Sequence, residues 1–132
     1  MKIEKLVFWS GIYNVTLVIA CISPKIYLDI FGLNFESPIM AKIISVVLIF
    51  TVAVLIISSR NLKSYAPIVY WEGIVRVLAG IILIPAGFLG SLGIFAGILG
   101  IVDVIWALIY FFGLTKKFNV SHWDLIAGKV IN

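Results

Sequence analysis

The fold is decided by a long apolar stretch, PIVYWEGIVRVLAGIILIPAGFLGSLGIFAGILGIVDVIWALIYFFGL, which covers residues 67–114. Charged side chains are rare in it. A membrane-spanning helix needs about 20 apolar residues, so this stretch is too long for one crossing and right for two. We therefore predict spans over residues 67–88 and 92–114, joined by a glycine-rich hairpin.

The composition of the whole chain agrees with a protein solvated largely by lipid. The chain has 132 residues, of which 63% are hydrophobic and 12% are charged, whereas a soluble domain has about 25% charged residues. The length allows about four crossings with short connections. We therefore predict a single domain over residues 1–132 with an all-α fold, an integral membrane four-helix bundle.

The two remaining spans are predicted before the long apolar stretch, over residues 6–23 and 39–58. Pro24 ends the first span, because proline cannot continue the helical hydrogen-bond ladder. Residues 25–38 are rich in aromatic residues and are expected to form an interfacial loop or a short surface helix. Pro67 suits the first turn of the third span, where its missing N–H is not needed.

The tail over residues 115–132 carries a helix-start signal. Ser121 followed by Asp124 resembles a capping box, with Asp in place of the usual Glu or Gln. The residues after it have helical apolar spacing, which predicts a C-terminal amphipathic interfacial helix anchored by Trp123. A frayed tail is the alternative.

The basic residues predict the orientation. With both termini on one side, that side holds Lys and Arg at positions 2, 5, 60, 63, 116, 117 and 129, and the other side holds Lys25 and Lys42. Basic residues of polytopic proteins collect in the cytoplasm. We therefore expect a multi-pass protein of the inner (plasma) membrane with cytoplasmic N- and C-termini. The net charge of +4 follows from this bias, and no nucleic-acid partner is expected.

The single cysteine has two interpretations. The run Leu17-Val18-Ile19-Ala20-Cys21 fits a lipoprotein cleavage site after a signal peptide. Alternatively, Cys21 is a buried cysteine at the end of a helix, a common place for this residue. One cysteine and one histidine give no multi-cysteine or His-rich site, so no metal and no cofactor are expected.

Small residues in the fourth span predict close helix packing. Gly93 and Gly97 have GxxxG spacing, and Gly100 continues a neighbouring stripe of small residues with Ala96. Such a stripe serves either as a dimer seam or as the packing surface for helices of the same chain. Asp103 lies on the stripe and needs a partner inside the bundle, which favours the second interpretation.

Polar residues in all four spans are predicted to meet. Glu72 and Arg76 are four residues apart and share a helix face. Counting a rise of 1.5 Å per residue from the cytoplasmic ends puts Glu72, Arg76, Asp103, Asn14 and Thr51 at depths of roughly 8–16 Å. A charge inside the bilayer is costly and therefore a functional-site hypothesis. The aromatic residues predicted around this site are Tyr13, Trp71, Trp106 and Tyr110.

This polar site has a structural and a functional interpretation. Arg76 with Glu72 and Asp103 is either an ion triad that fixes helix register, or part of a pocket open to the cytoplasmic half. Two carboxylates against one guanidinium leave a formal charge of −1, so one carboxyl is protonated or a cation is bound. No catalytic motif is present, so the predicted function is non-enzymatic.

Several functions and partners are consistent with these features. The first is binding of a small molecule, a lipid or a partner membrane protein at the polar site. The second is proton- or cation-coupled transport by a homo-oligomer, and the third is a purely structural or accessory role.

The chain resembles the DoxX-like superfamily of small four-helix membrane proteins. The residues that carry the resemblance are Pro24 with Phe31-Gly32, Arg76 with Gly80, and Asp103 with Trp106. The resemblance covers most of the chain through diffuse motifs. It implies a four-helix bundle that often acts as a membrane partner of other proteins, and it assigns a function to no residue.

Overall fold

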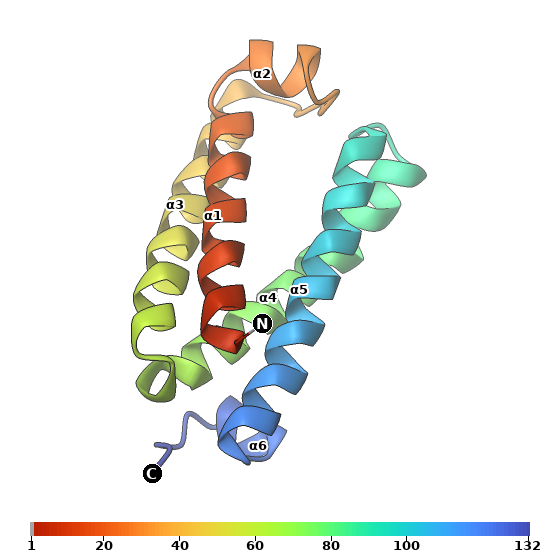
Figure 1. The fold of residues 1–132 in the computed structure, drawn as a ribbon. Helices are drawn as coiled ribbons and strands as arrows, with labels where there is room; N and C mark the ends of the chain where they lie inside the picture. The colour runs from red at the N-terminus through yellow and green to blue at the C-terminus, as the bar shows by residue number, and fades with distance from the viewer. Residues whose placement is uncertain (1) are drawn as a thin grey trace.

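The computed structural model describes residues 2–132, and the regular secondary structure in this range is helical. The predicted all-α four-helix membrane bundle is confirmed (Figure 1). Four helices are long and apolar enough to cross a membrane: α1 (Ile3–Cys21), α3 (Pro38–Arg60), α4 (Leu62–Phe88) and α5 (Ile94–Phe118). Two short helices, α2 (Pro24–Asp29) and α6 (His122–Ile126), follow the first and the last of them.

The helices begin and end at different residues from those predicted. Asn61 is the single residue between α3 and α4, so α4 starts five residues before Pro67. The prediction that Pro67 lies in the first turn of this span is wrong: Pro67 lies in the second turn, where its missing N–H removes one hydrogen bond from the helix. At the other end of the chain, α5 continues to Phe118 and stops where Asn119 adopts a left-handed conformation, with φ of 51°. Asparagine tolerates this conformation at a helix end.

The bundle consists of two helix pairs, α1 with α3 and α4 with α5. The pairs meet at the end that holds both termini, here called the terminal end, and they separate toward α2, here called the α2 end (Figure 1). Residues from α1, α3, α4, α5 and α6 form the main core at the terminal end. Its fully buried members include Val7, Leu55, Val69, Leu114 and Leu125.

A smaller core lies at the α2 end. It contains Tyr27, Leu33, Ala41 and Ala96, with aromatic residues packed around them. The segment after α2 crosses to the loop between α4 and α5, where the Asn34 N–H donates to the carbonyl of Leu92 at 2.9 Å. The predicted interfacial connection is therefore a short helix followed by an extended segment that bridges the two pairs.

Glycines bring α4 and α5 together. A Cβ at Gly87 would lie 2.1 Å from the backbone N of Gly97, and a Cβ at Gly80 would lie 3.0 Å from the carbonyl of Gly100. The stripe with Gly97 and Gly100 is therefore a packing surface for a helix of the same chain, the second of the two interpretations given from the sequence. Gly93 is different, because it precedes α5 with φ of 113° and faces the carbonyl of Gly32. Gly93 is therefore not part of the helix, but its carbonyl would lie 2.9 Å from a Cβ at Gly87, so it still belongs to the close approach of α4 and α5.

The tail helix is shorter than predicted. The capping box of Ser121 and Asp124 is present, but α6 has five residues and the backbone turns at Gly128, with φ of 70°. Leu125 is fully buried in the main core, while Trp123 is 76% exposed. The predicted short amphipathic helix is therefore a single helical turn, which docks on the main core through Leu125 and leaves Trp123 exposed.

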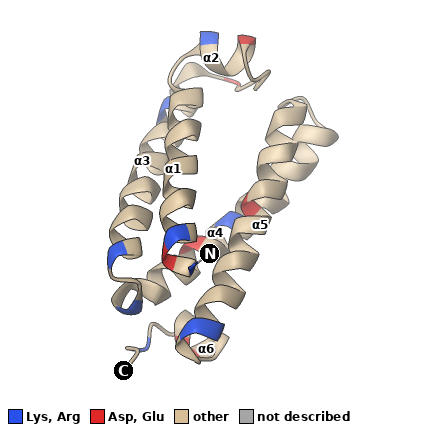
Figure 2. Cartoon of the chain, in the orientation of Figure 1, with Lys and Arg blue, Asp and Glu red and all other residues tan. Residues whose placement is uncertain are grey.

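Charged residues gather at the two ends of the bundle, and a few lie midway (Figure 2). The seven basic residues of the predicted cytoplasmic side lie in or within a few residues of helix ends, and these helix ends are all at the terminal end. Lys117 at the end of α5 forms an ion pair with Glu4 at the start of α1. The charges in the middle belong to the site described next.

Candidate functional site

Arg76 on α4 is the centre of the site. Its residue is 4% exposed, and each of its three side-chain nitrogens donates a hydrogen bond. Nε donates to Oε2 of Glu72 at 2.9 Å, Nη1 donates to Oδ1 of Asp103 on α5 at 2.7 Å, and Nη2 donates to Oδ1 of Asn14 on α1 at 3.0 Å. The guanidinium therefore joins three helices.

Asn14 extends the network to the fourth spanning helix. Its Nδ2 donates to Oγ1 of Thr51 on α3 at 2.8 Å, and the Thr51 hydroxyl donates to the carbonyl of Leu48. We name the set Asn14, Thr51, Glu72, Arg76 and Asp103 the polar cluster. All five residues were singled out from the sequence, and the structure brings all five together.

The polar cluster carries a formal charge of −1, with two carboxylates and one guanidinium. The side chains of Glu72 and Asp103 are 9% and 12% exposed. In each carboxylate one oxygen accepts a hydrogen bond from Arg76. The other oxygens, Oε1 of Glu72 and Oδ2 of Asp103, accept no hydrogen bond within residues 2–132. Uncompensated charge in an apolar environment is costly, so these oxygens favour a hydrogen-bond donor or a cation.

The predicted aromatic residues take different positions. Tyr110 belongs to the site, because its ring lies 5.8 Å from Cζ of Arg76. Trp106 lies beside Tyr110 and beside Tyr13, whose buried hydroxyl has no hydrogen-bond partner among the described residues. Trp71 is half exposed, and its indole N–H donates to the carbonyl of Ile126 at 2.9 Å. Trp71 therefore holds the tail on α4, and it also lines the cavity between α3 and α4 together with Thr51 and Glu72.

Sequence reasoning missed two polar contacts. Ser10 is fully buried and accepts a hydrogen bond from the Tyr110 hydroxyl. A signal existed, since Ser10 lies one turn before Asn14 and shares its helix face. Nδ1 of His122 lies 2.8 Å from the Tyr70 hydroxyl, a contact between α6 and α4. No local sequence pattern predicts the contact between His122 and Tyr70.

Two connected cavities adjoin the polar cluster. One of about 250 Å³ is lined by all five cluster residues and by apolar side chains of α1, α3 and α4. The other, of about 210 Å³, continues toward α2. We call the two cavities together the groove. Their shared lining residues are Leu17, Ile44, Leu48, Ala79 and Asp103.

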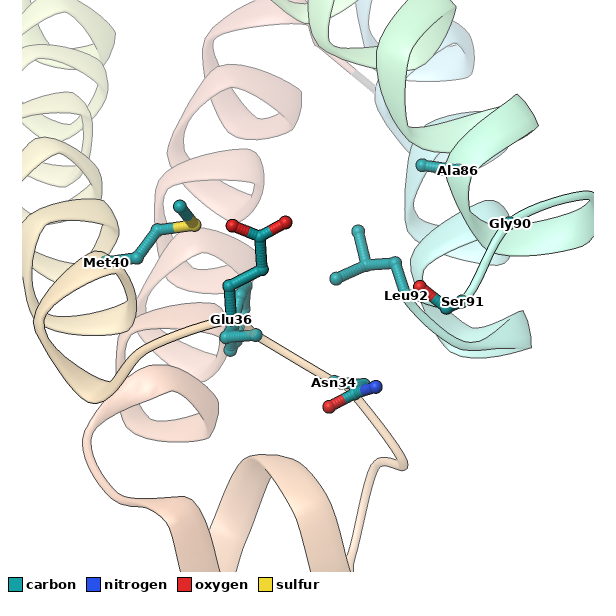
Figure 3. A pocket seen from close by; sticks show the side chains of 8 residues that line it. Asn34, Glu36, Met40, Ala86, Gly90, Ser91 and Leu92 are labelled. Carbon is teal, nitrogen blue, oxygen red and sulfur yellow. The ribbon is translucent and has the colours of Figure 1, made fainter.

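The groove continues in two directions. A cavity of about 320 Å³ between α3 and α4 shares Thr51 and Glu72 with it and reaches Phe50, which is 69% exposed. A cavity of about 380 Å³ at the α2 end, shown in Figure 3, shares Phe35 and Leu92 with it and is also lined by Glu36. The groove thus borders both the lateral surface and the α2 end.

The prediction of a pocket open to the cytoplasmic half stays a prediction. Bulky side chains, among them Leu55, Tyr110 and Leu114, fill the terminal end, which is the predicted cytoplasmic end. The glycines of α4 and α5 draw only these two helices together. The other pair separates from them toward α2, and the space around the polar cluster continues there as well as between α3 and α4.

Fold and site together define a small polytopic membrane protein with a buried charged cluster at the end of an apolar groove. No protein-family model, curated protein or solved structure matches the chain. Among residues 2–132, no three His, Cys, Asp or Glu side chains are grouped to hold a metal ion.

Proposed function

We propose that this protein is a non-enzymatic membrane protein that binds a small amphipathic molecule in the groove. One observation carries the proposal: a groove with apolar walls ends on a buried cluster that has free hydrogen-bonding atoms. Ligand sites are typically apolar cavities with a few convergent polar groups. Ion pairs that serve only to fix helix register have no need of an adjoining cavity.

Entry from the bilayer is supported by the cavity between α3 and α4. Its lining includes Phe50 and Ile68, which are 69% and 49% exposed, and it reaches Glu72 of the polar cluster. The α3 helix has few buried residues along its length. A molecule dissolved in the lipid would therefore reach the cluster without crossing a layer of packed core.

A cation-coupled transporter is the second candidate. The connection of the groove to the α2 end through Phe35 and Leu92 favours it. Transport also needs a route to the terminal end, and the main core with Leu55 and Leu114 fills that end. Binding needs only the one opening, and we place it first.

The cellular setting forms part of the proposal. The excess of basic residues at the terminal end supports a plasma-membrane protein with cytoplasmic termini. Kinship with the DoxX-like superfamily remains part of the proposal, and it rests on the sequence resemblance that Arg76 and Asp103 help to carry. A partner membrane protein or a second copy would find its contact on the lipid-facing surfaces.

The experiment compares two matched substitutions on α4. Ala79 lines both cavities of the groove, and Ala79→Phe would fill it. Leu78 is 54% exposed and lines neither cavity, so Leu78→Phe is the control. Each protein is extracted from its native membrane in polymer-bounded lipid discs, and its bound small molecules are measured by mass spectrometry. A molecule present with wild type and Leu78→Phe and depleted with Ala79→Phe is expected. Equal content in all three would refute binding in the groove.

A further inference from the structure

We infer that the molecule bound in the groove is a lipophilic amine, with a protonated nitrogen at the polar cluster and an apolar body along the groove. This inference rests on the proposed function and adds the chemical class of the ligand. Its basis is the charge of the cavity lining and the identity of the atoms left free, both of which distinguish a cation from an anion or a neutral head group.

The lining has a net negative charge. Among residues 2–132, Arg76 is the one basic residue that lines the groove or the two cavities joined to it, while Glu36, Glu72 and Asp103 all line them. At the polar cluster a bound monocation would bring the formal charge from −1 to zero. An anionic head would bring it to −2 in an apolar environment, where such a charge is strongly disfavoured.

The free atoms include two carboxylate oxygens. Oε1 of Glu72 and Oδ2 of Asp103 have no hydrogen-bond partner within residues 2–132, whereas three of the five N–H groups of Arg76 already donate to oxygens of the cluster. A protonated amine supplies N–H donors and a positive charge together, and charge-assisted hydrogen bonds are the stronger kind. A quaternary ammonium has the charge without the donors, so it leaves both oxygens unbonded.

The opening at the α2 end matches the same ligand. In Figure 3 the Glu36 carboxylate points into the cavity between Met40 and Leu92. Within residues 2–132 Glu36 forms no ion pair. Along α3, the lining extends from Met40 to Thr51, a distance of roughly 16 Å at 1.5 Å per residue, which accommodates an extended alkyl chain.

The test uses probes with one tail and different heads: dodecylamine, dodecyltrimethylammonium, dodecanol and dodecanoate. The protein is held in phosphatidylcholine nanodiscs, whose lipids have no net charge to attract the amine. Cys21 lines the groove and is the only cysteine of the chain, so its rate of alkylation by N-ethylmaleimide reports occupancy. The unfolding midpoint by circular dichroism gives a second readout.

Dodecylamine is expected to protect Cys21 and raise the unfolding midpoint at concentrations at least about tenfold lower than dodecanoate, a difference of about 1.4 kcal/mol. Dodecanol and dodecyltrimethylammonium should be intermediate. Asp103→Asn makes the cluster formally neutral and should remove the preference for the amine while leaving dodecanol unchanged. Leu78→Phe should retain the preference.

Each other outcome is decisive. Equal protection by all four heads, abolished by Ala79→Phe, would refute the amine and leave the groove as a binding site. Stronger protection by dodecanoate would show an anion site governed by Arg76. Protection by none of the probes would refute the inference, while the extraction experiment would still decide whether the groove holds another molecule.

Discussion

Nη2 of Arg76 on α4 lies 3.0 Å from Oδ1 of Asn14 on α1, and this hydrogen bond links the two helix pairs. Asn14 also donates to Thr51 on α3, so one amide side chain connects the guanidinium to both helices of the other pair. Elsewhere the two pairs share contacts mainly through the core at the terminal end. The position of α1 over the groove therefore depends on a polar contact as well as on apolar packing.

Replacement of Asn14 by leucine should destabilise the protein. The change leaves Nη2 of Arg76 and the hydroxyl of Thr51 without their partner, and an unsatisfied buried group costs about 1–3 kcal/mol. Chemical unfolding in detergent, followed by circular dichroism, measures the free energy. Thr16→Val is the control, because Thr16 is exposed and bonds only to its own helix. An unchanged stability for Asn14→Leu would show that the contact is energetically neutral.

Substitutions in the ion triad can distinguish a role in stability from a role in ligand binding. Arg76→Leu leaves two buried carboxylates unpaired and should cost about 3–5 kcal/mol, whereas replacing a whole buried ion cluster can be neutral. The triple variant Glu72→Gln, Arg76→Leu, Asp103→Asn should therefore recover much of the lost stability. It should still fail to retain the bound molecule, as judged by mass spectrometry of the extracted protein. A triple variant that regains both stability and ligand would assign the triad to packing alone.

The close approach of α4 and α5 predicts a strong effect at Gly87. A Cβ there would lie 2.1 Å from the backbone N of Gly97, so Gly87→Ala should push the helices apart and cost about 1–3 kcal/mol. At Gly113 the nearest atom is the flexible end of the Ile3 side chain, 2.6 Å away. Gly113→Ala is the matched control and should be nearly neutral or slightly stabilising, since alanine favours helix. Equal unfolding midpoints for the two variants would contradict the packing described here.

Cysteine labelling can test the orientation. Asn61, Asn132 and Asn34 are all exposed, the first two at the terminal end and the third at the α2 end. In a Cys21→Ala background, cysteines at positions 61 and 132 should react with a membrane-impermeant maleimide only after the cells are permeabilised. A cysteine at position 34 should react in intact cells. The reverse pattern would place the termini outside.

The docked tail should respond to acid. The hydrogen bond from Lys129, followed by that from the Ser121 hydroxyl, lowers the pKa of Asp124 below its ordinary value near 3.8. A carboxyl with a lowered pKa stabilises the fold above its unfolded pKa, and this contribution is lost as the pH falls through the folded pKa. Limited proteolysis with pepsin should therefore cut the tail faster as the pH drops below about 4, and Asp124→Asn should weaken that dependence. A pH-independent rate would show that the capping box does not hold the tail.

The ion pair between Asp124 and Lys129 also affects stability in the alkaline range, where stability is lost as the pH rises. The Asp124 carboxylate raises the pKa of Lys129 above its ordinary value near 10.5. That contribution is present below the unfolded pKa and is lost as the pH rises through the folded pKa. Both groups lie outside the spanning helices, with the Lys129 side chain 69% exposed and the Asp124 side chain 36% exposed, so the effect should be confined to the tail.

The sequence by itself determined the four apolar helices, because the length and hydropathy of each span are local properties set by the thickness of a bilayer. It also determined which polar residues meet. A charge inside lipid must find a partner within the bundle, and a rise of 1.5 Å per residue converts sequence position into depth. Arg76, Asp103 and Asn14 could be brought together on that basis alone.

The tertiary structure decided which way the space around these residues opens. Depth along a helix says nothing about the lateral distance between helices, which depends on side-chain volume summed over facing surfaces. Gly80 and Gly87 bring α4 onto α5, while Leu55, Tyr110 and Leu114 fill the terminal end. Only the assembled bundle shows that these two effects leave the groove between the pairs, on the side of the polar cluster that faces α2.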